Sequence, residues 1–206
     1  MSTDSNRCSL PVARSPLKGL ILVGGKSTRM QTDKAKLVYG DDPQMKICWD
    51  LLRLFCKETF LSCRIDQGDD DLYQHFEKIY DKQAYENIGP LGGILSAFDY
   101  DPYAPWLVLA CDLPFVDEST LSDLVTQRNP DKIATAYKSA HDGLPEPLCA
   151  IYEPQAKDVL LKFFKDGSKC PRKILINSDV KLLDPKNKKA LDNINTAEEY
   201  QVAKQR

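Results

Sequence analysis

The sequence is poor in histidine and has no closely spaced cysteine pair, and both absences limit its chemistry. Only two histidines, His75 and His141, occur among the 206 residues. Seven cysteines are present, yet no two of them are spaced as Cys-x-x-Cys, so we do not expect a zinc site. Cys111 has no base near it in the sequence, which disfavours a catalytic thiol. An odd number of thiols in apolar surroundings is typical of reduced cysteines, and we expect a cytoplasmic protein.

A long apolar run and an excess of one charge are also absent. No stretch approaches the roughly 18 apolar residues that span a membrane. Residues 1–16 are polar and lack the apolar core of a secretory signal. The net charge is −2 and the isoelectric point is about 5.8, whereas a nucleic-acid protein needs a clustered basic face. We therefore expect neither a membrane nor a nucleic acid as a partner.

The sequence does contain short apolar segments that alternate with helical patterns. The predicted strands are 17–23, 60–63, 78–80, 106–111, 133–137 and 148–152. The predicted helices begin near Pro43, span 72–76, follow the turn 89–93, begin near Asp117, span 154–165 and begin near Thr196. This alternation predicts an α/β fold: a single three-layer α/β/α domain, residues 17–206, with a Rossmann-like, mostly parallel sheet. Residues 1–16 are expected to form a flexible N-terminal extension.

The first predicted helix has a repeating apolar pattern. Ile47, Leu51, Leu54 and Phe55 recur at helical spacing after Pro43. This spacing predicts a helix that begins near Pro43.

A loop rich in glycine and cations follows the first predicted strand. Gly24 and Gly25 allow the backbone to approach a ligand closely, and Arg29 and Lys34 add two positive charges. Ligands of open α/β sheets bind beyond the carboxyl ends of the strands, so the loop is well placed to hold a nucleoside triphosphate. It matches neither the P-loop nor the Gly-x-Gly-x-x-Gly pattern. The alternative is a tight exposed turn with incidental charges.

A carboxylate follows the most strand-like segment, residues 106–111. Asp112 is suited to holding Mg²⁺, which prefers one or two carboxylates together with phosphate oxygens. On its position alone, Asp112 could equally cap the backbone of a loop or helix. Together with the Gly24–Lys34 loop, it favours a magnesium-dependent nucleotidyltransferase.

These segments together resemble the molybdenum cofactor guanylyltransferases, within the sugar-phosphate nucleotidyltransferase-like superfamily. The matching segments are Leu22–Lys34, Gly89–Gly93, Cys111–Pro114, Glu146–Leu148 and Asp192–Thr196, in the family's order. The resemblance implies a fold of the nucleotide-diphospho-sugar transferase type and transfer of GMP from GTP to molybdopterin with release of pyrophosphate. It also implies Mg²⁺ as the cofactor, and partner proteins of cofactor biosynthesis are a further expectation.

The resemblance assigns roles to individual residues. GTP would be bound by Leu22, Val23, Gly24, Gly25, Arg29, Lys34, Asp81, Gly92, Gly93 and Asp112. Arg29, Lys34 and Asp112 would be catalytic, Asp112 would hold the metal, and Asp81 would help to select guanine. Pro147, Asn193 and Asn195 would line the acceptor side. The alternatives are a cap for Asp81 and local turn hydrogen bonds for the two asparagines.

Three positions depart from the family pattern. Gln31 stands where glycine is usual, and Ser62 stands where an asparagine commonly follows the second strand. Glu146-Pro147 replaces the frequent His-Pro, so we expect a more acidic acceptor pocket. Three alternatives therefore stay open: a cytidylyltransferase, a sugar-phosphate nucleotidyltransferase, or a nucleotide-binding module without catalysis.

Overall fold

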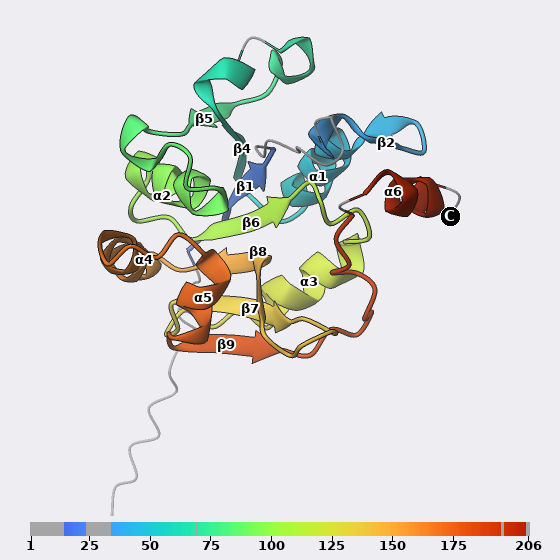
Figure 1. The fold of residues 1–206 in the computed structure, drawn as a ribbon. Coiled ribbons are helices and arrows are strands. Elements are labelled where there is room, and N and C mark those ends of the chain that lie inside the picture. Colours follow the sequence, from blue (N-terminus) through green and yellow to red (C-terminus); the bar gives the residue numbers. More distant parts are fainter. Residues whose placement is uncertain (1–14, 24–33, 69, 195, 205–206) are drawn as a thin grey trace, which may run out of the picture.

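One sheet of seven strands organises the molecule, in the order β5–β4–β1–β6–β8–β7–β9 (Figure 1). The structure is a computed structural model that describes residues 15–23, 34–68, 70–194 and 196–204. The strands are β1 (Lys18–Leu22), β4 (Glu58–Cys63), β5 (Lys78–Tyr80), β6 (Trp106–Ala110), β7 (Ala134–Lys138), β8 (Pro145–Tyr152) and β9 (Val180–Leu183). All six predicted strands are present, with ends shifted by up to three residues.

The sheet is mostly parallel, as predicted. β1 lies between β4 and β6 and pairs with both in parallel, and β5 continues this parallel half beyond β4. β8 is antiparallel to both of its neighbours, β6 and β7, whereas β9 is again parallel to β7. The carboxyl ends of β5, β4, β1 and β6 consequently lie along one edge of the sheet.

Helices cover both faces of the sheet, which confirms the three-layer prediction (Figure 1). α2 (Pro90–Tyr100), α4 (Ala156–Lys165) and α5 (Pro171–Ile176) pack on one face, and α1 (Gln44–Arg53) and α3 (Glu118–Thr126) pack on the other. In β1, Leu20 and Leu22 join the first core while Ile21 joins the second. Successive strand residues point to opposite faces, so an unbroken apolar run suits a strand buried on both sides.

The first predicted helix is present as α1, and Leu51 and Phe55 of its apolar pattern are partly buried against the core. Met45, Cys48 and Leu52 are the core residues of α1, whereas Leu54 lies beyond its end and is 60% exposed. The core residues form one apolar row along the helix, and the residues of the predicted pattern form a second row that is rotated from it by a fraction of a turn. Spacing alone cannot decide which row faces the sheet.

Several short elements were not predicted or differ from the prediction. α5, β9 and a small hairpin of β2 (Val38–Tyr39) and β3 (Asp42–Pro43) were missed. The segment expected to be a helix at 72–76 is a 3₁₀ turn at Asp71–Tyr73. The C-terminal helix α6 (Ala197–Lys204) is present, and Thr196 and Glu199 exchange the two hydrogen bonds of a capping box, each 3.1 Å long.

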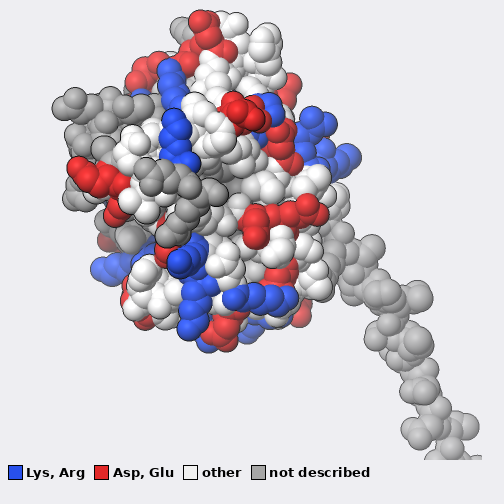
Figure 2. Space-filling model, turned by 90° about the vertical axis from the view of Figure 1, so that its right-hand side faces the viewer, with Lys and Arg blue, Asp and Glu red and all other residues white. Residues whose placement is uncertain are grey.

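Charges of both signs are mixed on the face drawn in Figure 2, among the residues described there. In the described part of the chain, no helix combines the length and apolar character that crossing a membrane requires. Residues 1–14 lie outside the described residues, and the Ser15 carbonyl accepts a hydrogen bond of 2.8 Å from Nη1 of Arg128. The domain boundary at residues 16 and 17 stays a prediction.

Candidate functional site

The two predicted functional segments meet at one edge of the sheet. β1 and β6 are neighbours in parallel register, with Leu22 beside Ala110, and the Cys111 N–H donates to the Leu22 carbonyl at 3.3 Å. Leu22 and Val23 are buried where the nucleotide loop begins. Gly24, Gly25, Arg29 and Gln31 lie outside the described residues, so their predicted roles stay predictions.

Lys34 and Asp112 form an ion pair across this edge. Nζ of Lys34, in the short 3₁₀ turn Lys34–Lys36, lies 3.5 Å from Oδ2 of Asp112. Their side chains are 22% and 20% exposed, so both groups are shielded yet reachable from the edge. Seventy-eight residues separate them in the sequence, and only the parallel pairing of β1 with β6 brings them together. A cation beside a carboxylate is an arrangement that can receive phosphate and a metal ion at once.

The second oxygen of Asp112 supplies a test of whether Mg²⁺ fits here. Oδ1 is buried and has no hydrogen-bond partner among the described residues. A buried carboxylate oxygen of this kind is costly unless something compensates it, and a divalent cation would do so. No cluster of three or more His, Cys, Asp or Glu residues with metal-binding geometry occurs within the described ranges. Asp112 therefore fits a Mg²⁺ site in which one carboxylate binds the ion and phosphate oxygens supply further ligands.

Asp81 directly follows β5, which is separated from β1 by β4 in the sheet. Burial raises the pKa of the Asp81 carboxyl to about 6, and a hydrogen bond of 3.3 Å from the Ser62 hydroxyl to its Oδ1 opposes that rise. Asp81 borders a hollow of about 360 Å³ lined by Arg64, Ile65, Asp66, Asp81, Glu86 and Asn87. A hollow with a carboxylate that is still ionised at neutral pH suits the predicted recognition of a base.

Gly92 and Gly93 lie in the first turns of α2, where the helix packs tightly against the sheet. A Cβ at Gly93 would lie 2.2 Å from the Ser62 hydroxyl oxygen, and one at Gly92 would lie 2.5 Å from the Tyr85 carbonyl. Gly89, just before the helix, has a φ of 68°, which favours glycine. The Gly-rich turn thus lets α2 approach Ser62 and Asp81 closely, and direct contact of Gly92 and Gly93 with GTP stays a prediction.

Pro147, which is predicted to line the acceptor side, lies in β8. β8 runs antiparallel to β6 with Leu109 beside Cys149, and continuing this register sets Glu146 opposite Asp112. The Pro147 carbonyl accepts a hydrogen bond of 2.9 Å from the buried Tyr152 hydroxyl. The start of β8 therefore lies next to the predicted metal ligand.

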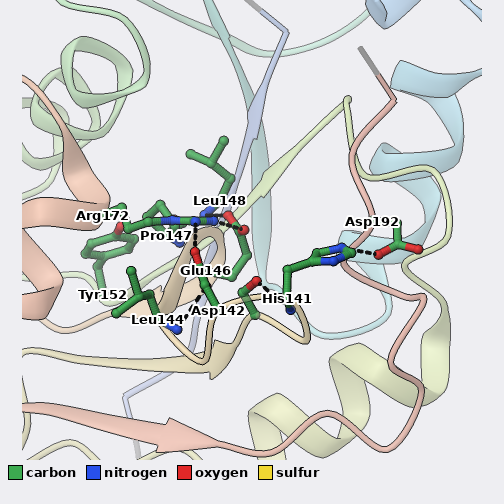
Figure 3. Close-up of polar contacts among 10 residues, drawn as sticks. His141, Asp142, Leu144, Glu146, Pro147, Leu148, Tyr152, Arg172 and Asp192 are labelled. Carbon is green, nitrogen blue, oxygen red and sulfur yellow. Dashed lines mark hydrogen bonds and ion pairs between the residues drawn. The ribbon is translucent and has the colours of Figure 1, made fainter. Parts of the chain in front are cut away.

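Glu146 is buried and paired with an arginine, and the expectation of a more acidic acceptor pocket stays a prediction. Its side chain is 3% exposed, and its Oε2 lies 2.8 Å from Nη2 of Arg172, at the start of α5 (Figure 3). Burial raises the pKa of Glu146, while the Leu148 N–H and the Arg172 guanidinium oppose that rise. Arg172 also reaches Asp142, with Nη1 at 3.3 Å from Oδ2. The charge of Glu146 is therefore balanced inside the protein.

The segment before α6 contacts the loop that follows β6. The Ile194 N–H donates to the Asp112 carbonyl at 3.0 Å, which brings the exposed Asn193 to the same edge. Nε2 of His141, in the loop between β7 and β8, lies 3.0 Å from Oδ1 of Asp192 (Figure 3). Asn195 lies outside the described residues, and its predicted role stays a prediction.

α6 is tied to the hairpin that follows Lys34. The Tyr200 hydroxyl donates to the Val38 carbonyl at 2.8 Å, and the Tyr39 and Tyr200 rings meet edge to face with centroids 5.3 Å apart. Neither tyrosine was predicted, nor was Arg172. The residues that these side chains contact lie far away in sequence, so no local pattern could have identified them.

Comparison with known proteins finds a matching family and several similar proteins. The family described as the MobA-like NTP transferase domain matches residues 19–181. A Synechocystis protein named "Molybdenum cofactor biosynthesis bifunctional protein" is 38% identical over 92% of this chain. The match covers only 54% of the length of that relative. "Molybdenum cofactor guanylyltransferase" of Pseudomonas putida is 25% identical over 93% of the chain and 100% of its own length.

A solved structure has the same fold. "Molybdopterin-guanine dinucleotide biosynthesis protein A" from Archaeoglobus fulgidus has a TM-score of 0.73 at 24% identity. The match covers 91% of this chain and 97% of that protein.

Proposed function

We propose that this chain, which belongs to the MobA-like NTP transferase family, transfers GMP from GTP to molybdopterin and releases pyrophosphate. Membership of the family makes the protein a nucleotidyltransferase. The names of its relatives and the order of the matching motifs support guanine and molybdopterin as the two substrates.

The observation that carries the proposal is the meeting of Lys34 and Asp112. Nζ and Oδ2 lie 3.5 Å apart at the shared carboxyl edge of β1 and β6, although the residues come from separate segments. GTP has about four negative charges, and at an effective dielectric near 20 each close charge pair contributes roughly 4 kcal/mol before desolvation. This edge is where an α/β sheet ordinarily binds nucleotides.

In the proposed reaction, the terminal phosphate of molybdopterin attacks the α-phosphorus of GTP in line. A new P–O bond forms, the bond from the α-phosphorus to the bridging oxygen of the β-phosphate breaks, and that oxygen leaves with pyrophosphate. Lys34 and the predicted Arg29 stabilise the charge that develops on the transferring and leaving groups. The acceptor phosphate is already ionised, so the reaction needs no strong general base, in keeping with only two histidines.

Asp112 would hold Mg²⁺ through its carboxylate. The bound ion would supply charge neutralisation for the phosphate oxygens. In the proposal, Pro147, Asn193 and Asn195 line the acceptor's place beside Asp112, and a partner protein delivers molybdopterin. A cytoplasmic location is part of the same proposal and rests on the cysteine composition.

Replacing Asp112 tests the proposed chemistry. We expect Asp112→Ala to reduce pyrophosphate release with GTP, molybdopterin and Mg²⁺ by at least about a hundredfold. Asp131→Ala, which removes an exposed carboxylate from a distant turn, is the matched control and should have normal turnover. Chelation of the metal should abolish turnover of the unaltered protein. Normal turnover of Asp112→Ala would refute the metal assignment.

Binding of each of the four nucleoside triphosphates tests the proposed substrate. We expect the largest thermal stabilisation with GTP and Mg²⁺. A preference for CTP or UTP would replace guanylyl transfer with one of the related nucleotidyl transfers. Binding of GTP without transfer to molybdopterin or any sugar phosphate would instead indicate a module without catalysis.

A further inference from the structure

Asn193, which is predicted to line the acceptor side, is exposed, whereas both of its neighbours are held in place. The Ile194 side chain is buried, and the Ile194 N–H donates to the Asp112 carbonyl at 3.0 Å. On the other side, the Asp192 carboxylate contacts the ring of His141. Asn193 therefore lies at the carboxyl edge of the sheet between two anchored residues, where its side chain can meet a ligand.

The contact between His141 and Asp192 joins two segments that are 51 residues apart in the sequence (Figure 3). Nε2 of His141 lies 3.0 Å from Oδ1 of Asp192, and the two side chains are 77% and 35% exposed. Because an ionised carboxylate can only accept, Nε2 carries the proton in this contact. A pair this exposed contributes little to folding stability. We therefore expect its main effect on the local path of residues 192–194.

The loop that carries His141 is braced by its own hydrogen bonds. The Ser139 N–H donates to the Leu144 carbonyl at 2.8 Å, and the Gly143 N–H donates to the Ser139 carbonyl at 2.9 Å. Gly143 has a φ of 70°, which favours glycine in this tight turn. The Ser139 hydroxyl also accepts from the His141 N–H at 3.2 Å. The backbone of His141 is therefore fixed relative to the ends of β7 and β8.

Asp142, the next residue, ties this loop to α5 and β8. Its Oδ2 lies 3.3 Å from Nη1 of Arg172, whose Nη2 lies 2.8 Å from Oε2 of the buried Glu146. Continuing the pairing of β8 with β6 sets Glu146 opposite Asp112. The loop is thus anchored to the strand beside the proposed metal ligand, and His141 connects it to the segment before α6.

We propose that His141 is a positioning residue for the acceptor: through Asp192 it fixes the backbone at Asn193, whose side chain then meets molybdopterin. The inference rests on the proposed function and adds a residue that no motif of the family resemblance contains. His141 itself does not touch the substrate. Fixing a binding residue in advance strengthens binding, because less conformational freedom is lost when the ligand arrives.

Steady-state kinetics of pyrophosphate release test the positioning role. We expect His141→Ala to raise the KM for molybdopterin by about threefold to tenfold, the effect of losing one hydrogen bond. The KM for GTP and the kcat at saturating molybdopterin should stay close to those of the unaltered protein. His141→Gln keeps an N–H donor of similar reach and should restore most of the acceptor affinity. His75→Ala, which removes the other histidine of the chain, also exposed, is the matched control.

Two double variants test whether His141 acts through the contacts named. If it acts through Asp192, adding His141→Ala to Asp192→Ala should not raise the KM for molybdopterin any further. If it acts on Asn193, adding His141→Ala to Asn193→Ala should likewise have no further effect. Thermal melting of each variant reports whether it is folded, and the exposure of the pair predicts only a small shift in melting temperature.

The outcomes separate this inference from the proposed function. An unchanged acceptor KM in His141→Ala, equal rises in both KM values, or additive effects in the double variants would overturn the positioning role while guanylyl transfer stands. A large fall in the melting temperature of His141→Ala would make His141 a structural residue and would overturn the role in the same way. Failure of the unaltered protein to transfer GMP to molybdopterin would overturn the proposed function, and the His141 assignment with it.

Discussion

The two halves of the sheet reach the same edge by different means. In the nucleotide half, β5, β4, β1 and β6 are all parallel, and Asp81 and Asp112 stand within two residues of a strand end. In the acceptor half, β8, β7 and β9, the strand nearest the site is antiparallel, and side chains from separate segments hold it through ion pairs. The first half places its functional groups by strand geometry, and the second by long-range pairing.

The halves also differ in charge balance. Asp112 keeps a buried oxygen without a partner among the described residues, and Asp81 borders an open hollow. Glu146, by contrast, is enclosed with Arg172, and Glu153 with Arg128. Asp112 and Asp81 can thus receive a ligand, whereas Glu146 and Glu153 are enclosed in ion pairs that stabilise the fold.

Breaking the buried pair of the acceptor half should have the largest effect on stability. Nε of Arg128 lies 2.7 Å from Oε1 of Glu153, and both side chains are almost fully buried. Arg128→Ala would leave Glu153 buried without its cation, and we expect the free energy of unfolding to fall by about 3–5 kcal/mol in urea titrations. The KM for GTP of the folded protein should not change, because the pair lies at the opposite edge of the sheet.

An exposed pair of the same half provides the control. Nζ of Lys132 lies 2.6 Å from Oδ1 of Asp179, and Lys132→Ala should cost no more than about 1 kcal/mol. Equal losses for Arg128→Ala and Lys132→Ala would contradict the view that buried ion pairs hold the acceptor half.

Adding one methyl group should disturb the nucleotide half. Gly93→Ala would set a Cβ 2.2 Å from the Ser62 hydroxyl oxygen and push α2 away from β4. We expect a loss of about 1–3 kcal/mol in the free energy of unfolding and a higher KM for GTP, with the KM for the acceptor unchanged. Ser62→Gly removes the opposing atoms and should recover part of the stability in the double variant; strict additivity of the two changes would argue against the clash.

The pH dependence of GTP binding should report on Asp81. Because the pKa of its carboxyl is about 6, the ionised form that accepts from guanine is lost below that pH. We expect the KM for GTP to rise by about tenfold per pH unit below 6 and to be constant above 7. Asp81→Asn is the control for titration of GTP itself, and an identical pH profile in that variant would exclude Asp81 as the cause.

The same shift predicts how Asp81 affects stability. The folded state binds this proton more tightly than the unfolded chain, so the contribution of Asp81 to stability falls as the pH rises from 3.8 to about 6. Asp81→Asn should therefore not lower the melting temperature at pH 7, even though it weakens GTP binding. A large drop in melting temperature would assign Asp81 a mainly structural role.

The contact between α6 and the hairpin should have the smallest effect. Tyr200→Phe removes the hydrogen bond of 2.8 Å to the Val38 carbonyl and keeps the ring against Tyr39. We expect a loss of about 0.5–1.5 kcal/mol and a few-fold lower kcat, since the hairpin directly follows Lys34. Val202→Ala, at an exposed position of the same helix, should leave kcat unchanged. Equal kcat values for the two variants would show that the contact does not influence Lys34.

The sequence predicted the nucleotide half far better than the acceptor half, for a physical reason. An apolar run that ends just before Gly24 or Asp112 can be recognised from adjacent residues alone. Parallel pairing then places the ends of neighbouring strands side by side. Arg172 and Glu146 are separated by 26 residues, His141 and Asp192 by 51. Such contacts depend on how α5 and the loops pack, which residue order alone does not reveal.

Within single helices and strands, the sequence did not reveal which helix face is buried, and the shortest elements were missed. The helical spacing of Leu54 did not reveal that it is exposed, because Met45, Cys48 and Leu52 give α1 an equally regular apolar row. α5 and β9 were missed because each is too short to show a clear period. Glu146 was identified, but its partner Arg172 was not, so the sequence did not reveal this ion pair.

The hydrogen bond from Ile194 to the Asp112 carbonyl has a consequence for synthesis of the protein. During translation, the strands that present Lys34 and Asp112 emerge long before residue 194 and Tyr200. The pairing of β1 with β6 can therefore form before residue 194 has been made, whereas the contact between Ile194 and the Asp112 carbonyl can form only afterwards.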